Sequence, residues 1–374
     1  MKDKIDKMVD SLKDELINDL RELIKIPSKK SEANADAPYG ENCKKVLEKA
    51  IEIGSKKGFA TKNIDNHMVY CSIGESSEYV CAMGHLDVVD EMPGWKYPPF
   101  KGEIHDNKIY ARGALDNKGP IMAAFYGLYT LKKLGVEFNR EFRIVFGSDE
   151  ESGMSDLKYY LTKEKPPIMG FSPDNKFPAI YGERARAKIE VKGNFEDFAN
   201  FLNNKILAGD PVKNLDIDVS DEDFGRMILR GKKIFRDVSE YGLEFSLSIP
   251  ICDIDLVIKK VKENSLGLKT KLISYENAFL EDKNSYLVQV LNDAYNDFMG
   301  ENQKPTTTTG MTYAHFCPNI IPFGPSFPGQ NGIAHLPNEW MDIDDLLTCT
   351  KIYAYAFYKI NESFNKGELN EKIN

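Results

Sequence analysis

One short apolar run, with the polar residues that end it, constrains this chain more than any other segment. Residues 79–82 (Tyr-Val-Cys-Ala) follow three polar residues and lead into Met-Gly-His-Leu-Asp at 83–87. A continuous apolar run bounded by polar residues is typical of a strand buried on both faces. Residues two apart on a strand project to the same face, so we expect His85 and Asp87 to lie side by side. Such a pair suits a metal-binding imidazole oriented by a carboxylate, although a simple hydrogen-bonded pair is the commoner outcome.

Carboxylates recur at the ends of other predicted elements. Asp116 lies in a glycine-flanked turn before a helix that begins near Pro120, and Asp174 follows the apolar residues 168–171. Glu150 and Glu151 follow an apolar strand in the run Asp-Glu-Glu. Consecutive acids at the mouth of a buried strand are costly unless positive charge neutralises them, with a solvated acidic loop as the alternative. Functional groups at the carboxyl ends of strands that alternate with helices indicate an α/β sheet with its site along that edge.

The spacing of apolar and polar residues changes at about residue 184. Residues 187–193 and 243–250 alternate between apolar and polar, and residues 269–274 also indicate a short strand. The segments between these strands have apolar residues at helical spacing. We therefore expect a small α+β domain over residues 184–277, inserted between the two parts of a larger domain, 1–183 and 278–374. The larger domain is expected to hold a mixed, mostly parallel sheet flanked by helices. Apolar spacing over residues 4–25 predicts that it opens with a helix.

Composition excludes several function classes. A net charge of -9 argues against nucleic acid and anionic membranes as partners. No apolar run reaches the roughly 18 residues of a membrane span, and the charged N-terminal segment has no signal-peptide core. The six cysteines are scattered without paired spacing. A reduced, cytoplasmic setting is the simplest interpretation.

The residues at the ends of the predicted elements form one candidate constellation. It consists of two histidines and five carboxylates: His85, Asp87, Asp116, Glu150, Glu151, Asp174 and His335. One bridging carboxylate, two further carboxylates and two imidazoles suffice to hold a pair of transition-metal ions about 3.5 Å apart. The remaining acids are then available to orient a ligand and to act as a general base.

Several sequence blocks carry a family resemblance. The segments at 84–89, 112–119, 149–153 and 173–174 resemble those of the M20 metallopeptidases. The spacer after Trp95, the segment Phe-Gly-Pro-Ser-Phe-Pro-Gly at 323–329 and His-Leu-Pro-Asn-Glu at 335–339 are similar to the PepV/Sapep-type dipeptidase branch. The resemblance covers nearly all of residues 10–182 and 278–360.

The resemblance implies a role for each residue of the constellation. The ligands of two divalent ions, zinc or manganese with cobalt as an alternative, would be His85, Asp116, Asp174, Glu151 and His335. Asp116 would bridge the ions, and Asp87 would hydrogen-bond to His85. Glu150 would be the general base that takes a proton from water and passes it to the leaving amine. The inserted domain would be a lid that closes over the substrate.

The resemblance fails in the predicted lid. Related dipeptidases have a lid histidine that stabilises the oxyanion, but the five histidines here stand at 67, 85, 105, 315 and 335. Where those relatives carry a carboxylate-binding arginine, this chain has Ser248. His315 is a candidate replacement for the histidine, or else an ordinary loop residue. Arg184 and Arg186 are candidates for the carboxylate, or else part of a solvated hinge. The full set of candidate substrate-binding residues is Gly310, Thr312, Tyr313, His315 and Arg184.

Three functions are compatible with this sequence. The first is a metal-dependent hydrolase that cleaves dipeptides or other short peptides. The second is an N-acyl amino-acid deacylase of the same family, for which the altered lid leaves room. The third is a non-catalytic paralogue that binds metal, since the lid histidine and arginine are missing. The expected partner is a small peptide or N-acyl amino acid, and the chain is expected to be a monomer or a homodimer.

Overall fold

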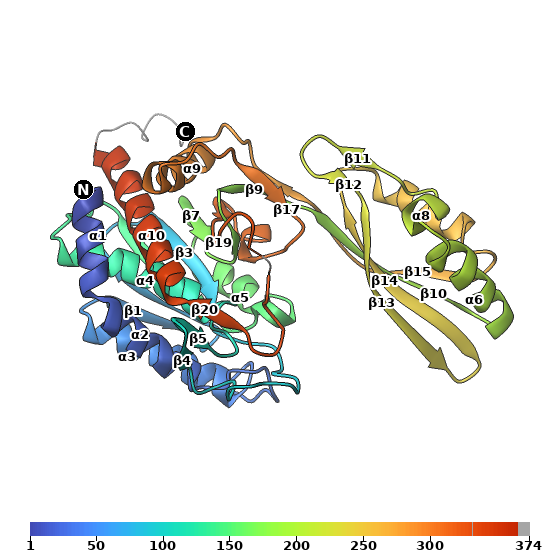
Figure 1. Cartoon of the computed structure of the whole chain (residues 1–374), viewed down its shortest axis with the longest axis horizontal. Helices are drawn as coiled ribbons and strands as arrows, with labels where there is room; N and C mark the ends of the chain where they lie inside the picture. The colour runs from blue at the N-terminus through green and yellow to red at the C-terminus, as the bar shows by residue number, and fades with distance from the viewer. Residues whose placement is uncertain (331, 366–374) are drawn as a thin grey trace. The chain divides into compact units, whose positions relative to one another are not determined.

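The chain folds into two compact units. The computed structural model describes residues 1–330 and 332–365. The larger unit comprises Met1–Ile180, Asp282–Pro305 and the described residues from Thr312 onward, and the smaller unit comprises Tyr181–Glu281 and Thr306–Met311. Figure 1 shows a helix-flanked sheet in the larger unit and an antiparallel sheet with helices in the smaller one. Each unit is described separately below.

A six-stranded mixed sheet forms the centre of the larger unit. Its strand order is β1-β2-β6-β3-β7-β18. The strands are β1 (Ala60–Ile64), β2 (Met68–Ile73), β3 (Tyr79–His85), β6 (Glu141–Gly147), β7 (Met169–Ser172) and β18 (Ile320–Pro322). β3 is parallel to both β6 and β7, and β7 is parallel to β18, while β1, β2 and β6 pair in antiparallel fashion. The predicted mixed, mostly parallel sheet is confirmed.

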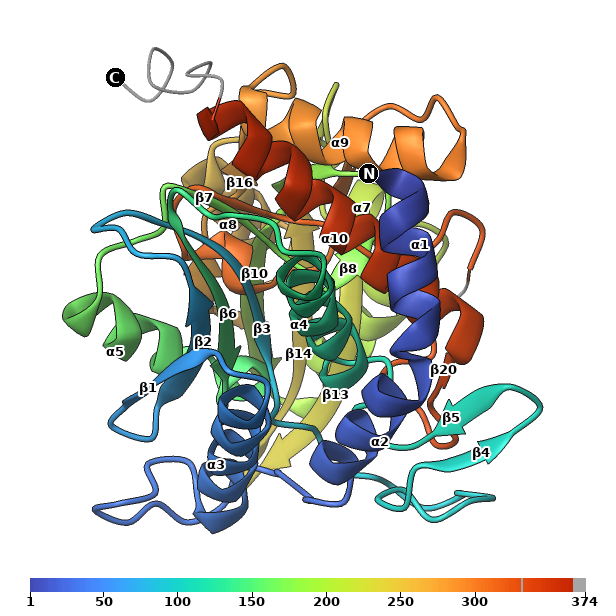
Figure 2. The same ribbon diagram turned by 90° about the vertical axis from the view of Figure 1, so that its left-hand side faces the viewer.

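Helices bury the central strands. Every residue of β3 is buried, as its unbroken apolar run predicts. Figure 2 shows α3 (Glu41–Lys56) and α4 (Lys118–Lys133) in front of the sheet, and α10 (Ile343–Asn365) packs against α4. Gly127 permits this close helix pairing, because a Cβ there would lie 2.9 Å from the backbone nitrogen of Ala354. The helix α9 (Tyr286–Met299) in turn packs against α10.

The N-terminal segment differs from its prediction in one respect. Two helices, α1 (Lys2–Ser11) and α2 (Lys13–Ile24), replace the single expected helix. They are separated at Leu12, whose φ of -97° and ψ of 0° depart from helical values. Leu12 is itself buried, so the apolar spacing continues across the break and gives no sign of it.

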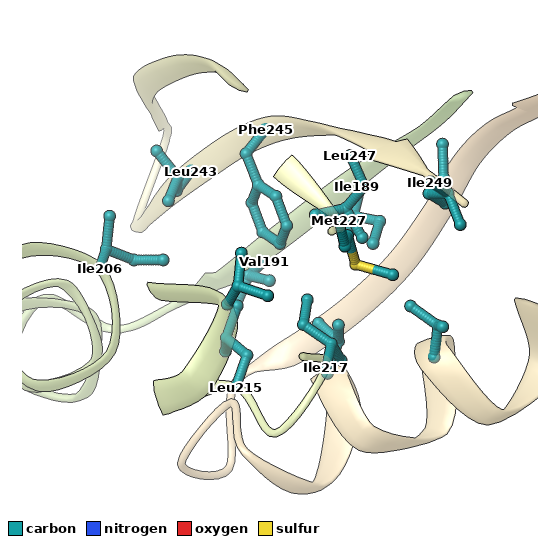
Figure 3. Close-up of a cluster of buried hydrophobic side chains, with 14 of the residues drawn as sticks. Ile189, Val191, Ile206, Leu215, Ile217, Met227, Leu243, Phe245, Leu247 and Ile249 are labelled. Atoms are coloured by element: carbon teal, nitrogen blue, oxygen red, sulfur yellow. The ribbon is translucent and has the colours of Figure 1, made fainter. Parts of the chain in front are cut away.

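The smaller unit is a four-stranded antiparallel sheet with helices on one face. Its strand order is β13-β14-β10-β15, with β10 (Ala185–Gly193), β13 (Ile228–Asp237), β14 (Glu240–Ile249) and β15 (Lys269–Glu276). Figure 3 shows its apolar core, in which side chains of β10 and β14 meet those of the segments that cover them. The helices α6 (Phe195–Phe201) and α8 (Ile254–Glu263) contribute Phe198, Phe201, Val257 and Val261.

Short elements complete both units. In the larger unit these are β4 (Glu103–His105), β5 (Lys108–Tyr110), β20 (Trp340–Asp342), β8 (Asn175–Lys176), β19 (Pro325–Ser326), α5 (Ser155–Lys163) and 3₁₀ turns at Glu150–Ser152 and Tyr313–His315. In the smaller unit they are α7 (Pro211–Asn214), a π-helical turn at Leu202–Leu207, β11 (Ser220–Asp221), β12 (Gly225–Arg226), β16 (Phe279–Leu280) and β17 (Thr306–Thr308). The strand β9 (Ile180–Glu183) begins at the last residue of the larger unit's first segment and continues into the smaller unit. None of the helices described has both the length and the apolar character required to cross a membrane.

Candidate metal centre

The parallel strands bring the predicted site residues to one edge of the larger sheet. β3 ends at His85, the 3₁₀ turn that carries Glu150 and Glu151 follows β6, and Asp174 follows β7. Because β3 pairs in parallel with both β6 and β7, the carboxyl ends of all three strands meet at the same edge. The loop that precedes α4 adds Asp116 to this edge.

His85 lies at the centre of the first group of polar side chains. Its imidazole is fully buried, and its Nε2 atom lies 3.1 Å from Asp116 Oδ1 and 3.6 Å from Asp174 Oδ2. The Oε2 atom of Glu150 is 4.0 Å from the same nitrogen. One imidazole nitrogen and two carboxylates therefore converge on a single point, as ligands of a divalent cation must.

His335 lies at the centre of a second group, which shares one member with the first. Its Nε2 atom is 3.1 Å from Asp116 Oδ2 and 2.9 Å from Glu151 Oε1. In each group, the candidate ligand atoms lie within 4.8 Å of one another. Asp116 directs one carboxylate oxygen to each group, which is the arrangement of a carboxylate that bridges two ions.

The electrostatics of the cluster favour cations. Burial opposes a charge on Asp116, but hydrogen bonds with His335 and His85 outweigh it and lower the pKa of Asp116 below its usual range. Hydrogen bonds with Asp116 and Glu151 raise the pKa of His335 to about 10. Burial, reinforced by the charge of Asp174, raises the pKa of Glu150 well above its ordinary value. Acidic oxygens are thus packed together in a largely buried cluster, where divalent ions would neutralise them.

Asp87 connects the histidine to the acidic turn. The imidazole Nδ1 of His85 lies 2.9 Å from the backbone oxygen of Asp87 and 3.3 Å from its Oδ1. The two carboxylate oxygens of Asp87 also accept hydrogen bonds from the backbone nitrogens of Glu150 and Glu151, at 3.2 and 3.1 Å. One buried carboxylate therefore fixes the ring of His85 and the start of the turn that carries both glutamates.

Two residues that the sequence did not single out hold the Asp116 turn. Glu339 accepts hydrogen bonds from the backbone nitrogens of Leu115 and Asp116, at 2.9 and 3.1 Å, and forms a buried ion pair with Arg112 at 2.7 Å. Asn117 donates through Nδ2 to the backbone oxygen of Pro173 at 2.7 Å and to Asp174 Oδ1 at 3.2 Å. Both residues lie in sequence segments already associated with the site. Their nearness in sequence to candidate ligands is the signal that could have found them.

Asp156 is a third residue of this kind; it lies in α5 and binds the backbone that follows β6. Its Oδ2 atom accepts hydrogen bonds from the backbone nitrogens of Ser148 and Asp149, at 2.7 and 2.9 Å, and from the hydroxyl of Tyr313. Gly147 is required beside it, because a Cβ there would lie 1.9 Å from the Tyr313 hydroxyl. Asp156 thereby fixes the backbone just before Glu150.

The candidate substrate-binding residues fall into both units. Tyr313 is buried and bonded to Asp156, and Thr312 caps the following turn through a bond from the backbone nitrogen of Ala314 at 3.1 Å. His315 ends that turn and packs edge-on against Phe316. The other two candidates, Arg184 and Gly310, belong to the smaller unit, where Arg184 donates to the backbone oxygens of Phe224 and Arg226. The role of these residues in substrate binding stays a prediction.

Comparison with known proteins identifies the family. The model of peptidase family M20/M25/M40 matches residues 81–359, which include every residue of the candidate metal centre. The chain belongs to this family, and the resemblance stated from the sequence blocks is confirmed. It is a dipeptidase-like hydrolase of the M20 group.

Named relatives and solved structures agree with this assignment. Putative dipeptidase YtjP of Bacillus subtilis is 28% identical over 451 aligned positions, which cover 93% of this chain and 97% of the relative. The aligned length exceeds the 374 residues of this chain, so the relative contains segments that this chain lacks. Human carnosine dipeptidase 1 has the same fold, with a TM-score of 0.75 at 16% identity over 96% of this chain and 99% of that one. The dipeptidase Dug1p of Saccharomyces cerevisiae gives a TM-score of 0.73 at 18% identity, over 97% and 99%.

Proposed function

We propose that this protein is a two-metal dipeptidase in which Glu150 is the general base. The observation that carries the proposal is the position of Asp116, whose two carboxylate oxygens each lie 3.1 Å from the Nε2 atom of a different histidine. A purely structural acid has no need to complete two separate groups of ligand-type atoms. Shared carboxylates are characteristic of two-metal hydrolases.

The residues present fit a pair of divalent ions. His85 and Asp174 would hold one ion, Glu151 and His335 the other, and Asp116 both. Nitrogen and carboxylate donors without thiolate suit zinc, manganese or cobalt. A related peptidase, YXEP of Bacillus subtilis, is described as binding a dinuclear metal, which supports the same assignment here. When bound, such ions polarise the scissile carbonyl and lower the pKa of water.

Of the two remaining carboxylates, Glu150 would transfer protons and Asp87 would position other residues. Glu150 is not needed in either ligand group, and its Oε2 atom lies 4.0 Å from His85 Nε2. In our proposal it accepts a proton from the attacking water and delivers it to the departing amine as the C–N bond breaks. Asp87 does not meet the substrate; it holds His85 and the backbone of Glu150 in place.

The proposed substrates are dipeptides or other short peptides. The support comes from relatives that are named putative dipeptidases and that align over more than nine-tenths of both chains. We also assign the protein to the cytoplasm, since all six cysteines are unpaired, as in a reducing compartment.

A substrate panel tests this proposal. The purified chain should hydrolyse dipeptides when manganese, zinc or cobalt is added, and it should lose this activity after chelation. If the protein hydrolyses N-acetyl amino acids but not dipeptides, it is a deacylase and not a dipeptidase. No turnover of either class, with two ions bound per chain, would instead identify a non-catalytic metal-binding protein.

A further inference from the structure

A pocket with mostly apolar walls lies within the larger unit. Its volume is about 290 Å³. Its walls come from the turn that carries Asp116, from β19 and the loop after it, from β20 and from the start of α10, and both short strands contact α10 (Figure 1). All of its lining residues belong to the larger unit. The apolar ones are Leu115, Pro325, Ile333, Trp340 and Met341.

The pocket shares two chain segments with the candidate metal centre. Leu115 directly precedes Asp116, which contributes to both ligand groups, and Ile333 lies two residues before His335. Glu339 accepts hydrogen bonds from the backbone nitrogens of Leu115 and Asp116, at 2.9 and 3.1 Å, so the segment that carries His335 also holds the Asp116 turn. Consecutive Cα atoms are about 3.8 Å apart. The pocket wall therefore begins one residue away from the proposed bridging ligand.

The amide and carboxylate groups of the pocket are already engaged within the fold. Gln330 Nε2 donates a hydrogen bond to Asp345 Oδ2 at 2.8 Å. Asp342 Oδ1 accepts hydrogen bonds from the backbone nitrogens of Asp344 and Asp345, at 2.9 and 3.5 Å, as a residue that caps the start of a helix does. Acids at the start of a helix are also stabilised by the helix dipole. These carboxylates have a structural role, so the pocket favours an uncharged ligand over a cation.

The pocket has the size and surface of a site for one apolar side chain. Small-molecule sites are mostly apolar and typically hold about 300 to 1,000 Å³. At about 290 Å³, this pocket lies at the lower end of that range, which suits a single side chain better than a whole cofactor. Ile333 and Trp340 in its wall are only partly buried, so a side chain bound there would remove their apolar surface from water.

We propose that this pocket binds an apolar side chain of the peptide substrate, and that Ile333 is a specificity-determining residue. The assignment of the occupant to a substrate rests on the proposed function. It makes dipeptides with a leucine-like side chain the preferred class of substrate. A side chain bound beside the Asp116 turn would help to hold the scissile bond at the metal centre, where its binding energy contributes to positioning. Ile333 is the residue to vary, because it belongs to a loop and to no strand or helix of the fold.

The kinetic test changes the size of the pocket in both directions, in the metal-loaded, full-length chain. Ile333→Phe narrows the pocket and Ile333→Ala widens it, while the control Ile104→Phe changes an isoleucine of the same unit that is 42% exposed and outside the pocket lining. The kcat/KM is measured for Ala-Ala and for dipeptides in which leucine or phenylalanine replaces either alanine. Wild type should prefer a leucine peptide over Ala-Ala by about ten- to a hundredfold, the scale expected for burying that side chain. Ile333→Phe should lose most of this preference, Ile333→Ala should shift it towards phenylalanine, and the control should keep it. The same preference in all four proteins would overturn the proposal.

A binding measurement keeps this test separate from the proposed function. The chain has two tryptophans, so Trp95→Phe leaves Trp340, in the pocket wall, as the sole reporter of fluorescence. The uncharged probe N-acetyl-leucine amide should shift the Trp340 emission, N-acetyl-glycine amide should not, and Ile333→Phe should abolish the shift. A wild type that hydrolyses no dipeptide refutes the proposed function, and the emission then still decides whether the pocket binds an apolar side chain. Emission that does not respond to the leucine probe refutes the site itself.

Discussion

At the scale of single residues, Asp116 connects the two ligand groups of the proposed metal centre. Its two oxygens serve two histidines, while Asp174 and Glu151 each belong to one group. Its position is in turn fixed by Glu339, which binds the backbone of the turn, and by Asn117, which reaches across to Asp174. If the proposed ligand assignment holds, a change at the shared ligand affects both ions, and a change at an unshared ligand affects only one.

This difference gives a prediction about metal content. Asp116→Ala should reduce bound metal from about two ions per chain to nearly none, whereas Asp174→Ala should leave about one, because only Asp116 contributes to both groups. Metal would be measured by mass spectrometry after gel filtration. Asp90→Ala, which removes an exposed carboxylate paired with Lys29 at 3.3 Å, is the control and should retain both ions. Equal losses in the Asp116 and Asp174 variants would contradict the bridging role.

The sequence revealed the candidate ligands and Asp87, but not the other residues that hold them. His85 and Asp174 follow apolar runs, and a polar group at the end of a buried strand is a local signal that can be read without a structure. Glu339 and Asp156 gave no such signal, because both bind backbone nitrogens: Glu339 binds that of Leu115, 224 residues away, and Asp156 binds that of Ser148, 8 residues away. No spacing rule links a carboxylate to a distant backbone group.

At the scale of elements, the end of β6 is the critical point, because Glu150, the proposed general base, begins the 3₁₀ turn that follows it. Asp156 reaches back from α5 to bind the backbone at Ser148 and Asp149. It is fully buried, and burial raises its pKa to about 7. In the unfolded chain an aspartate has a pKa of about 3.9.

The raised pKa of Asp156 predicts a pH-dependent contribution to stability. The folded state holds the proton up to about pH 7, so this contribution is complete below about pH 4 and is lost as pH rises towards 7. Asp156→Asn should consequently be most destabilised relative to wild type near pH 4 to 5. The difference should shrink by pH 8, by at most about 4 kcal/mol for a shift of about three units. Urea unfolding in the presence of EDTA would measure it, and a difference that is constant with pH would contradict this account.

The sequence predicted some strands and missed others, and the difference has a physical reason. β3, β6 and β7 are buried on both faces, so their apolar runs identified them. β13 was missed, because it is an edge strand whose ten residues are mostly exposed and read Ile-Leu-Arg-Gly-Lys-Lys-Ile-Phe-Arg-Asp. Nothing in such a sequence alternates with period two, and its pairing with β14 is a property of the fold.

At the scale of the whole molecule, the candidate metal centre and the apolar core of the smaller unit lie in different units. Every candidate ligand lies in the larger unit, while the smaller unit has its own apolar cluster around Phe245 and Leu247. Damage to that cluster should therefore leave the metal centre intact.

Phe245→Ala tests this independence. Phe245 is fully buried, and truncating a buried phenylalanine typically costs about 3 to 5 kcal/mol of unfolding free energy. Urea unfolding should report a loss of that size for the smaller unit, while metal content stays at the wild-type value. Val238→Ala, at a side chain that is 94% exposed in the same unit, should change stability by less than about 0.5 kcal/mol. Loss of bound metal in the Phe245 variant would show that the two units are coupled.

The most direct test of the whole account is a paired measurement on Glu150→Gln, in which turnover of a dipeptide and metal content are determined on the same preparation. The account predicts that both ions remain, because Glu150 belongs to neither ligand group, and that turnover falls by about a hundredfold or more, as expected when a general base is removed. Turnover close to the wild-type rate, with both ions bound, would contradict the role of Glu150 as the base of a two-metal dipeptidase.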